Sequence, residues 1–235
     1  MKMNWYFLVV FMGALPKINT IYEDNHLLVV EKPINIPVCE DESLDRDLLS
    51  MLKDYLKIKY NKPGNVYLGL VHRLDRPVGG IMVFAKTSKA ASRLSKQVSE
   101  HIMKKTYVAV VQGNIKDSDC FIDYLKKNKK KNVSYVTNEI NGKEAILNYK
   151  KLDYKNKFSL VEIELKTGRS HQIRVQFSSR GFPLVGDYKY NKNWDGRCNI
   201  ALFAKRLQFI HPVSKELMTF ELDIPDRFPF SCFIK

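Results

Sequence analysis

The sequence predicts an α+β fold built on a mixed, largely antiparallel sheet with flanking helices. Segments with the two-residue alternation of strands outnumber segments with helical spacing, and short turns join many of them. The chain shows no internal repeat, and 45% of its 235 residues are apolar, which suits a globular core without disulfide staples. We therefore expect one large domain or two small ones.

The first quarter of the chain predicts a β-hairpin followed by a helix. Residues 21–31 form two apolar runs around Asp24-Asn25, a pair suited to a tight turn. Residues 43–58 carry apolar side chains at spacings of three and four, and Ser43 is the expected N-cap. The apolar set of this helix is Leu44, Leu48, Met51, Leu52 and Tyr55.

Two further helices are expected among the strands. Thr87 or Ser88 caps the first, whose apolar face is Ala91, Leu94, Val98 and Ile102. The second covers residues 171–180 with Ser170 as its cap and Gly181 at its end, although alternating apolar residues there leave a strand open. The expected strands are 66–71, 80–85, 107–111, 133–140, 144–151, 158–165, 201–210 and 217–222.

The charge of the chain points to a polyanionic partner. Its formal net charge is +14, so nucleic acid is the first expectation. The lysine-rich segment 126–131 is typical of a flexible charged loop and would add salt-dependent affinity for RNA or DNA. A basic protein on an acidic membrane is the alternative, but no basic amphipathic helix is strong enough to support it.

The four cysteines, Cys39, Cys120, Cys198 and Cys232, lie far apart in the sequence. Their spacing argues against a zinc or other metal site and against a disulfide framework. We therefore expect no metal and a cytoplasmic location.

Residues 1–19 are predicted to be an N-terminal extension of uncertain role that precedes a domain over 20–235. Their apolar run, residues 5–15, is too short to span a bilayer. Three interpretations stay open: a secretion signal, a packed first strand, or an extension from an upstream start.

The stretch 71–86 places one carboxylate, Asp75, between Arg73 and Arg76, directly after His72. Neighbouring cations favour the ionised form of an acid, which suits a nucleophile or base at neutral pH. The alternative is an ion-paired turn on a basic surface.

A second candidate site begins at Thr167 and leads into the helix expected at 171–180. Arg169 lies just before this helix, whose first N–H groups can hold a phosphate or a carboxylate. Gln172, Gln176 and Arg180 share one face of it. A basic, capped surface helix explains the same pattern without a ligand.

Five segments in order resemble the RluA-type pseudouridine synthases. They are IYEDNHLLVVEKPINIPV at 21–38, HRLDRPVGGIMVFAKT at 72–87, KKTYVAVVQG at 104–113, TGRSHQIRVQFSSRGFPLVGDYKY at 167–190 and ALFAKRLQFIHPVSKELMTFELDIP at 201–225. The resemblance implies a pseudouridine synthase-like domain with a central active-site cleft. It also implies an isomerase that converts uridine in RNA to pseudouridine without a metal or organic cofactor.

The resemblance also implies roles for single residues. Asp75 is the catalytic aspartate, Tyr107 stacks on the target base, and Arg169 is the basic partner of the aspartate. Arg73 helps to open the RNA or fills the place of the flipped nucleotide. The other residues expected at the RNA are His72, Arg76, His171 and Gln172. An aromatic platform suits this chemistry because the base must leave its stack.

The sequence departs from the family at two positions. Gly79 stands where a serine is usual, and Phe203 where a histidine is common. The N-terminal RNA-binding domain of the S4 type that many relatives carry is not expected. The partner is expected to be structured ribosomal or transfer RNA, and the protein a monomer. Two rivals stay open: an RNA-binding protein that lost catalysis, for example one acting in ribosome assembly, and a secreted or membrane-tethered basic protein.

Overall fold

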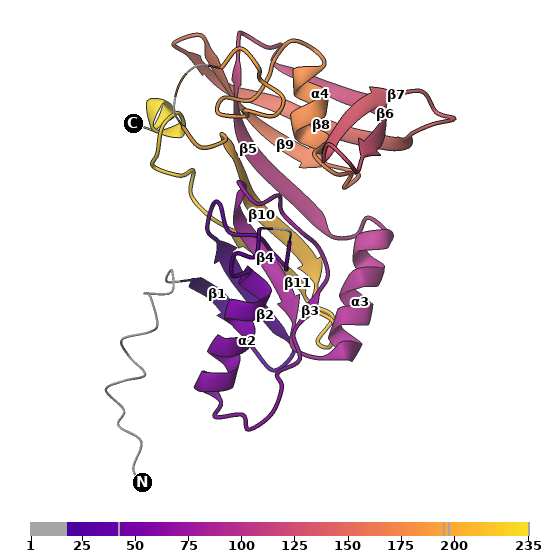
Figure 1. The fold of residues 1–235 in the computed structure, drawn as a ribbon, viewed down its shortest axis with the longest axis vertical. Coiled ribbons are helices and arrows are strands. Elements are labelled where there is room, and N and C mark those ends of the chain that lie inside the picture. Colours follow the sequence, from indigo (N-terminus) through magenta and orange to yellow (C-terminus); the bar gives the residue numbers. More distant parts are fainter. Residues whose placement is uncertain (1–17, 42, 195, 197, 235) are drawn as a thin grey trace.

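A single mixed sheet runs through the molecule in this computed structural model, which describes residues 18–41, 43–194, 196 and 198–234. The described residues form 11 strands in the order β1-β2-β4-β10-β5-β9-β8-β6-β7, with β3 added to β4 and β11 to β10 (Figure 1). Every pairing is antiparallel except that of β4 with β10. The predicted fold class, α+β on a mixed, largely antiparallel sheet, is confirmed.

The strand and helix bounds are as follows. The strands are β1 Asn19–Glu23, β2 Leu27–Lys32, β3 Gly69–Leu70, β4 Gly79–Ala85, β5 Lys104–Gln112, β6 Ser118–Asn128, β7 Val133–Thr137, β8 Lys143–Lys155, β9 Phe158–Leu165, β10 Leu202–Ile210 and β11 Leu217–Glu221. The helices are α2 Leu48–Lys59, α3 Ser88–Ser99, α4 Gln172–Ser178 and the short 3-10 helix η1 Phe230–Phe233.

The long strand β5 joins the two halves of the sheet. It pairs with β10 along one edge and with β9 along the other. Figure 1 shows β1, β2, β4, α2 and α3 at one end of β5, and β6, β7, β8 and α4 at the other. The residues of β5 therefore connect the two halves of the molecule.

The hairpin of β1 and β2 forms as predicted because Asp24 closes its turn. The Asp24 carboxylate accepts hydrogen bonds from the backbone N–H groups of His26 and Leu27, at 2.7 and 2.6 Å. This local bond pattern depends only on residues within the turn.

Helix α2 begins later than predicted. Its N-cap is Asp47, whose side chain accepts a hydrogen bond from the Ser50 N–H, and not Ser43. Ser43 instead donates to Asp41 and accepts from Arg76, at 2.5 and 2.8 Å. Arg76, from a distant segment, thus fixes the loop before the helix. Leu44 was expected on the buried face of the helix, but it lies in this loop and is 87% exposed.

Helix α3 begins at its predicted cap, since the Thr87 side chain accepts from the Ala90 N–H. It ends at Ser99, so Ile102 lies beyond the helix and is 43% exposed. The strand expected at 66–71 is reduced to β3, and the lysine segment expected as a loop begins on β6.

Gly80 lets β4 and β10 run side by side. Its φ is +121°, and a Cβ there would lie 2.3 Å from the carbonyl oxygen of Ala204. Only glycine fits this parallel contact without a shift of the backbone. A Cβ at Gly79 would lie 3.1 Å from both Ile34 and the Lys32 carbonyl, so the family's serine has little room here.

None of the helices in the described ranges is long and apolar enough to cross a membrane. The three interpretations of residues 5–15 concern residues outside those ranges.

Candidate active site

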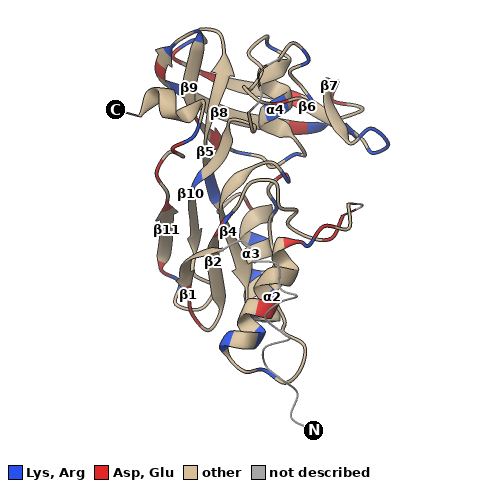
Figure 2. Ribbon diagram, turned by 60° about the vertical axis from the view of Figure 1, so that its left-hand side comes forward, with Lys and Arg blue, Asp and Glu red and all other residues tan. Residues whose placement is uncertain are grey.

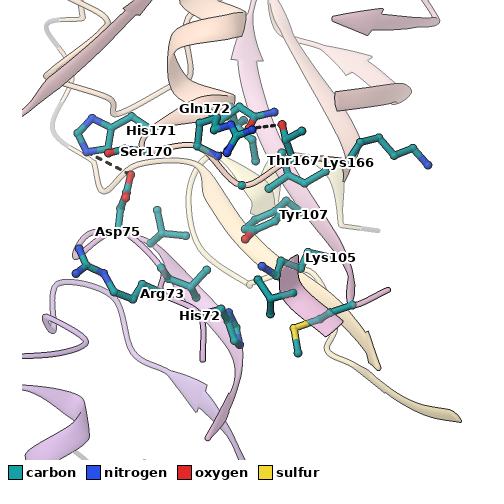
Figure 3. A pocket seen from close by; sticks show the side chains of 18 of the residues that line it. His72, Arg73, Asp75, Lys105, Tyr107, Lys166, Thr167, Ser170, His171 and Gln172 are labelled. Carbon is teal, nitrogen blue, oxygen red and sulfur yellow. Dashed lines mark hydrogen bonds and ion pairs between the residues drawn. The ribbon is translucent and has the colours of Figure 1, made fainter. Parts of the chain in front are cut away.

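A cleft of about 860 Å³ opens between the two halves of the molecule (Figure 3). Most of its walls come from three segments: residues 70–78, the end of α3 with the start of β5, and residues 165–174. Lys127 and Leu202 complete them. The two candidate sites predicted from the sequence, around Asp75 and around Arg169, therefore face one cleft.

The turn that carries Asp75 is fixed by a buried lysine. Lys32 is 1% exposed, and its ammonium donates hydrogen bonds to the carbonyl oxygens of Pro33, Arg76 and Val78 at 2.7 to 2.9 Å. Burial lowers the pKa of Lys32 to about 7, an effect that the nearby Asp75 charge opposes. The Val78 N–H closes the turn on the Asp75 carbonyl, at 2.9 Å.

The Asp75 carboxylate is ion-paired inside the cleft. Its Oδ2 lies 3.1 Å from Arg174 and 3.7 Å from Nε2 of His171. The Asp75 side chain stays 29% exposed, so one side of it remains open to the cleft. The Asp75 carboxylate thus has a positively charged partner inside the cleft.

Arg174 is itself held by a buried acid. It donates to both carboxylate oxygens of Asp187, from Nε at 2.7 Å and from the second terminal nitrogen at 2.6 Å. Its guanidinium also lies 5.1 Å from the centre of the Tyr190 ring. Burial lowers the pKa of Arg174, but its hydrogen bonds to the Asp187 and Asp75 carboxylates and their charges raise this pKa above its usual value. The guanidinium is thus oriented before any substrate arrives.

His171 completes this side of the cleft as a neutral imidazole. Burial lowers its pKa to about 4, against the opposing charge of Asp75. The Tyr190 hydroxyl accepts from the Ser134 N–H at 2.7 Å and therefore has its own proton to give to Nδ1 of His171, also 2.7 Å away. That bond leaves the ring proton on Nε2, facing Asp75.

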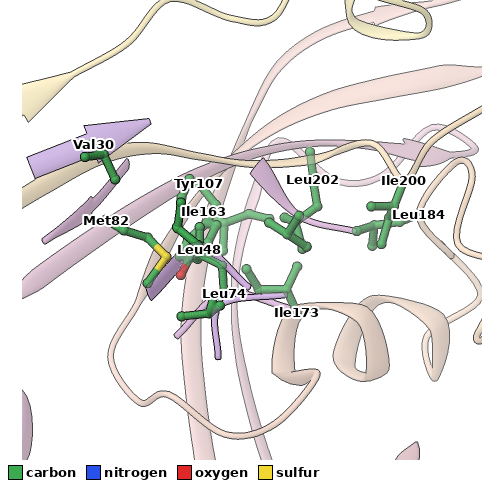
Figure 4. Close-up of a cluster of buried hydrophobic side chains, with 14 of the residues drawn as sticks. Val30, Leu48, Leu74, Met82, Tyr107, Ile163, Ile173, Leu184, Ile200 and Leu202 are labelled. Atoms are coloured by element: carbon green, nitrogen blue, oxygen red, sulfur yellow. The ribbon is translucent and has the colours of Figure 1, made fainter. Parts of the chain in front are cut away.

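Tyr107 comes from β5 and lies against the apolar core. It is 7% exposed and belongs to a buried cluster with Leu74, Ile163, Ile173 and Leu202 (Figure 4). Burial and the charge of Asp75 raise the pKa of its hydroxyl, so it is a neutral phenol at pH 7. Figure 3 shows its hydroxyl end turned toward the cleft.

Arg169, the predicted partner of Asp75, lines the cleft but is bonded elsewhere. Its Nε donates to the carbonyl oxygen of Glu144 at 2.7 Å, and Arg174 takes the place at the carboxylate. His171 has a left-handed backbone (φ 55°), which turns the chain between Arg169 and α4 and leaves Ser170 without a capping bond. At about 100° per residue, Arg174 projects from the face of α4 opposite Gln172. The predicted Gln172 face therefore lies away from Asp75, and Arg174 was not among the predicted site residues.

Gln172 and Arg76 are engaged inside the protein. The Gln172 amide accepts from Thr167 and from the Arg169 N–H and donates to the Ile146 carbonyl, at 2.8 to 3.1 Å. Gln172 is 3% exposed, so it fixes the loop before α4 and has no free group for the expected RNA contact. Arg76 bonds Ser43, Asp45 and the Asn35 carbonyl, bonds with which an RNA contact would compete.

Arg73 is exposed on the surface, whereas its neighbour His72 is buried. Arg73 is exposed and reaches only the Cys39 sulfur, at 3.9 Å, among the described residues. His72 is 8% exposed and accepts a hydrogen bond from the Val83 N–H at 3.2 Å. Burial lowers the pKa of His72 to about 3, with a smaller effect from Lys105. Arg73 is therefore available to a ligand on the surface, and His72 only to one inside the cleft.

The chain is similar to known proteins of a single family. A sequence profile described as RNA pseudouridylate synthase matches residues 26–179. An uncharacterized RNA pseudouridine synthase of Bacillus subtilis, YhcT, is 32% identical over 89% of this chain and 69% of its own. The ribosomal large subunit pseudouridine synthase D of Zymomonas mobilis is 32% identical over 87% of this chain and 68% of its own.

Solved structures agree on the fold. Human RNA pseudouridylate synthase domain containing 4 superposes with a TM-score of 0.76, at 20% identity over 92% of both chains. Human RNA pseudouridylate synthase domain containing 1 gives 0.71, at 22% identity over 90% of this chain and 85% of that chain.

Proposed function

The chain belongs to the RNA pseudouridylate synthase family, whose members are isomerases, and we propose that it converts uridine to pseudouridine in a structured RNA with Asp75 as the catalytic carboxylate. The observation that carries the assignment is the placement of Asp75. Its carboxylate lies 3.1 Å from Arg174 and is still partly open to a cleft that also contains Tyr107.

The reaction needs what this arrangement supplies. The bond from C1′ to N1 of the uridine breaks, a bond from C1′ to C5 forms, N1 gains a proton and C5 loses one. A carboxylate can add to the sugar or take a proton from it, and both roles require the ionised form. Arg174 supplies the counter-charge at Asp75, while Asp187 keeps Arg174 in place. Tyr107 offers a ring on which the flipped base can stack.

Charge near the cleft supports an RNA substrate. Lys127, Lys189 and Arg73 line a second, smaller hollow that also contains Asp75. Figure 2 shows further basic residues at the tip of the β6–β7 hairpin. We propose ribosomal RNA as the first RNA to test, because two similar proteins are named as ribosomal large subunit synthases. Transfer RNA is the second.

The test is the replacement Asp75→Ala with pseudouridine measured by nucleoside chromatography of modified transcripts. We expect a loss of at least about 10³-fold, because Asp75 is the only carboxylate among the described residues that line the cleft. Asp45→Ala removes an exposed carboxylate beside Arg76 and should change the rate only a few-fold. An Asp75→Ala protein that still forms pseudouridine would overturn the assignment. A folded wild type that binds RNA and forms none would favour the non-catalytic RNA-binding alternative.

A further inference from the structure

The end of the cleft away from Asp75 carries hydrogen-bond donors that the protein itself does not satisfy. His72 and Lys105 both line this end, and Figure 3 shows Lys105 between Tyr107 and His72. We call this pair the donor subsite. No role was assigned to Lys105 by the sequence, and the chemistry at Asp75 does not use it.

His72 presents a buried N–H with no acceptor. Its Nε2 accepts from the backbone N–H of Val83 at 3.2 Å, so Nε2 carries no proton. The single proton of the neutral ring is then on Nδ1. That atom is buried and has no hydrogen-bond partner among the described residues. A buried donor left in this way costs about 1–3 kcal/mol, which a bound acceptor would recover.

Lys105 presents a cation with no counter-charge. It precedes Tyr107 by two residues on β5, so both side chains leave the same face of the strand. Within the described ranges its ammonium forms no ion pair or hydrogen bond. Burial lowers the pKa of Lys105, and no carboxylate opposes that shift. Asp75, the acid of this cleft, is instead bound to Arg174.

The other walls near this end of the cleft include Ser99 and His101 but no carboxylate among the described residues. They include the apolar side chains of Leu70, Val71, Val98 and Met103. An ammonium in such surroundings is stabilised most by an anion, because the charge has lost part of its hydration. A neutral base carbonyl would satisfy the His72 N–H and leave the lysine charge uncompensated. A phosphate satisfies both.

We propose that the donor subsite of His72 and Lys105 binds a phosphate group of the substrate RNA close to the target uridine. The RNA origin of the phosphate rests on the proposed function, whereas the affinity of the subsite for phosphate does not. Lys105 and His72 then hold the backbone on one side of Tyr107 while Asp75 faces the sugar on the other.

The test follows the His72 ring by NMR in protein labelled with ¹⁵N-histidine. Inorganic phosphate, uridine 3′- and 5′-monophosphate, and uridine are titrated separately. We expect phosphate and both nucleotides to shift the Nδ1–H resonance of His72, and uridine to leave it unshifted. Lys105→Met should weaken that binding at least tenfold, and Lys105→Arg should restore it.

Lys104→Met is the matched control, because Lys104 is exposed and leaves the opposite face of the same strand. It should bind phosphate like the wild type. The proposal is overturned if phosphate does not shift the His72 resonance, if Lys105→Met and Lys104→Met bind alike, or if uridine alone produces the same shift.

Pseudouridine formation by the wild type is measured in parallel. Absence of that activity would defeat the proposed function while the phosphate titration still decides the subsite. Conversely, an active enzyme with a silent His72 resonance would defeat only the subsite.

Discussion

The two ends of the cleft treat charge in opposite ways. At one end, Asp75, Arg174 and Asp187 form a chain of ion pairs in which each charge faces an opposite one. At the other, Nδ1 of His72 has no acceptor among the described residues, and no carboxylate compensates the charge of Lys105. The first end is complete without a ligand, and the second is not.

This difference indicates that the Asp75 end orients the catalytic groups and that the His72 and Lys105 end binds part of the substrate. Buried ion pairs with good geometry hold their groups in one place, which a catalytic carboxylate needs. Uncompensated donors cost stability in the free protein, and a ligand that satisfies them recovers that cost on binding. Single replacements at either end of the cleft test this difference.

The largest effect is expected at the complete end. Arg174→Met should lower the free energy of unfolding by about 3–5 kcal/mol, because it leaves the fully buried Asp187 carboxylate without its partner. Pseudouridine formation should fall to background as well. Urea unfolding and the nucleoside assay measure the two losses.

Arg169→Met is the control for that replacement, since the Arg169 side chain bonds only the Glu144 carbonyl among the described residues. It should cost less than about 1 kcal/mol. Equal effects of the two replacements would mean that the ion-pair chain does not organise the site. Restored stability in Arg174→Met combined with Asp187→Asn would support the buried charge as the cause.

An intermediate effect on stability is expected when the pH is lowered, because His72 at the other end of the cleft is held neutral. The pKa of His72 is lowered from 6.5 to about 3 by burial, with Lys105 acting in the same direction. Between these two values the unfolded chain takes up a proton that the folded chain refuses. Stability is therefore full above pH 6.5 and falls toward pH 3, by up to about 1.4 kcal/mol per pH unit.

Replacement His72→Gln isolates this contribution, because its amide oxygen can still accept from the Val83 N–H but does not titrate. Urea unfolding at pH 7 and pH 5 should show a smaller loss for the variant than for the wild type. His171, with a pKa lowered to about 4, contributes a loss of the same sign in both proteins. Identical losses would show that His72 is not held neutral.

The smallest effects are expected at Arg73 and Arg76, the two arginines that flank Asp75. Arg76 is ion-paired within the protein, whereas Arg73 is exposed and available to a ligand. Arg73→Gln should leave stability within about 0.5 kcal/mol. It should also reduce the salt dependence of RNA binding by about one phosphate contact. Arg76→Gln should cost up to about 1 kcal/mol through its pairs with Asp41 and Asp45 and leave RNA binding unchanged. Fluorescence anisotropy at several salt concentrations separates them, and a reversed pattern would refute the contrast.

The sequence by itself determined the parts of this protein that depend on neighbouring residues. The hairpin turn at Asp24, the cap at Thr87 and the alternation that became β9 all rest on contacts within a few positions. The family resemblance singled out Asp75 and Tyr107 and placed both in one predicted cleft. The structure has that cleft, with both residues in its wall.

Only the tertiary structure decided which charges meet. Arg174 and Asp75 are 99 positions apart, and the sequence pointed to Arg169 as the partner of Asp75. The left-handed turn at His171 precedes α4, the helix that carries Arg174. The same holds for the donor subsite, because a missing acceptor is a property of everything packed around a side chain. Local patterns report the conformation of a segment, whereas the partner of a charge depends on distant segments that the sheet brings together.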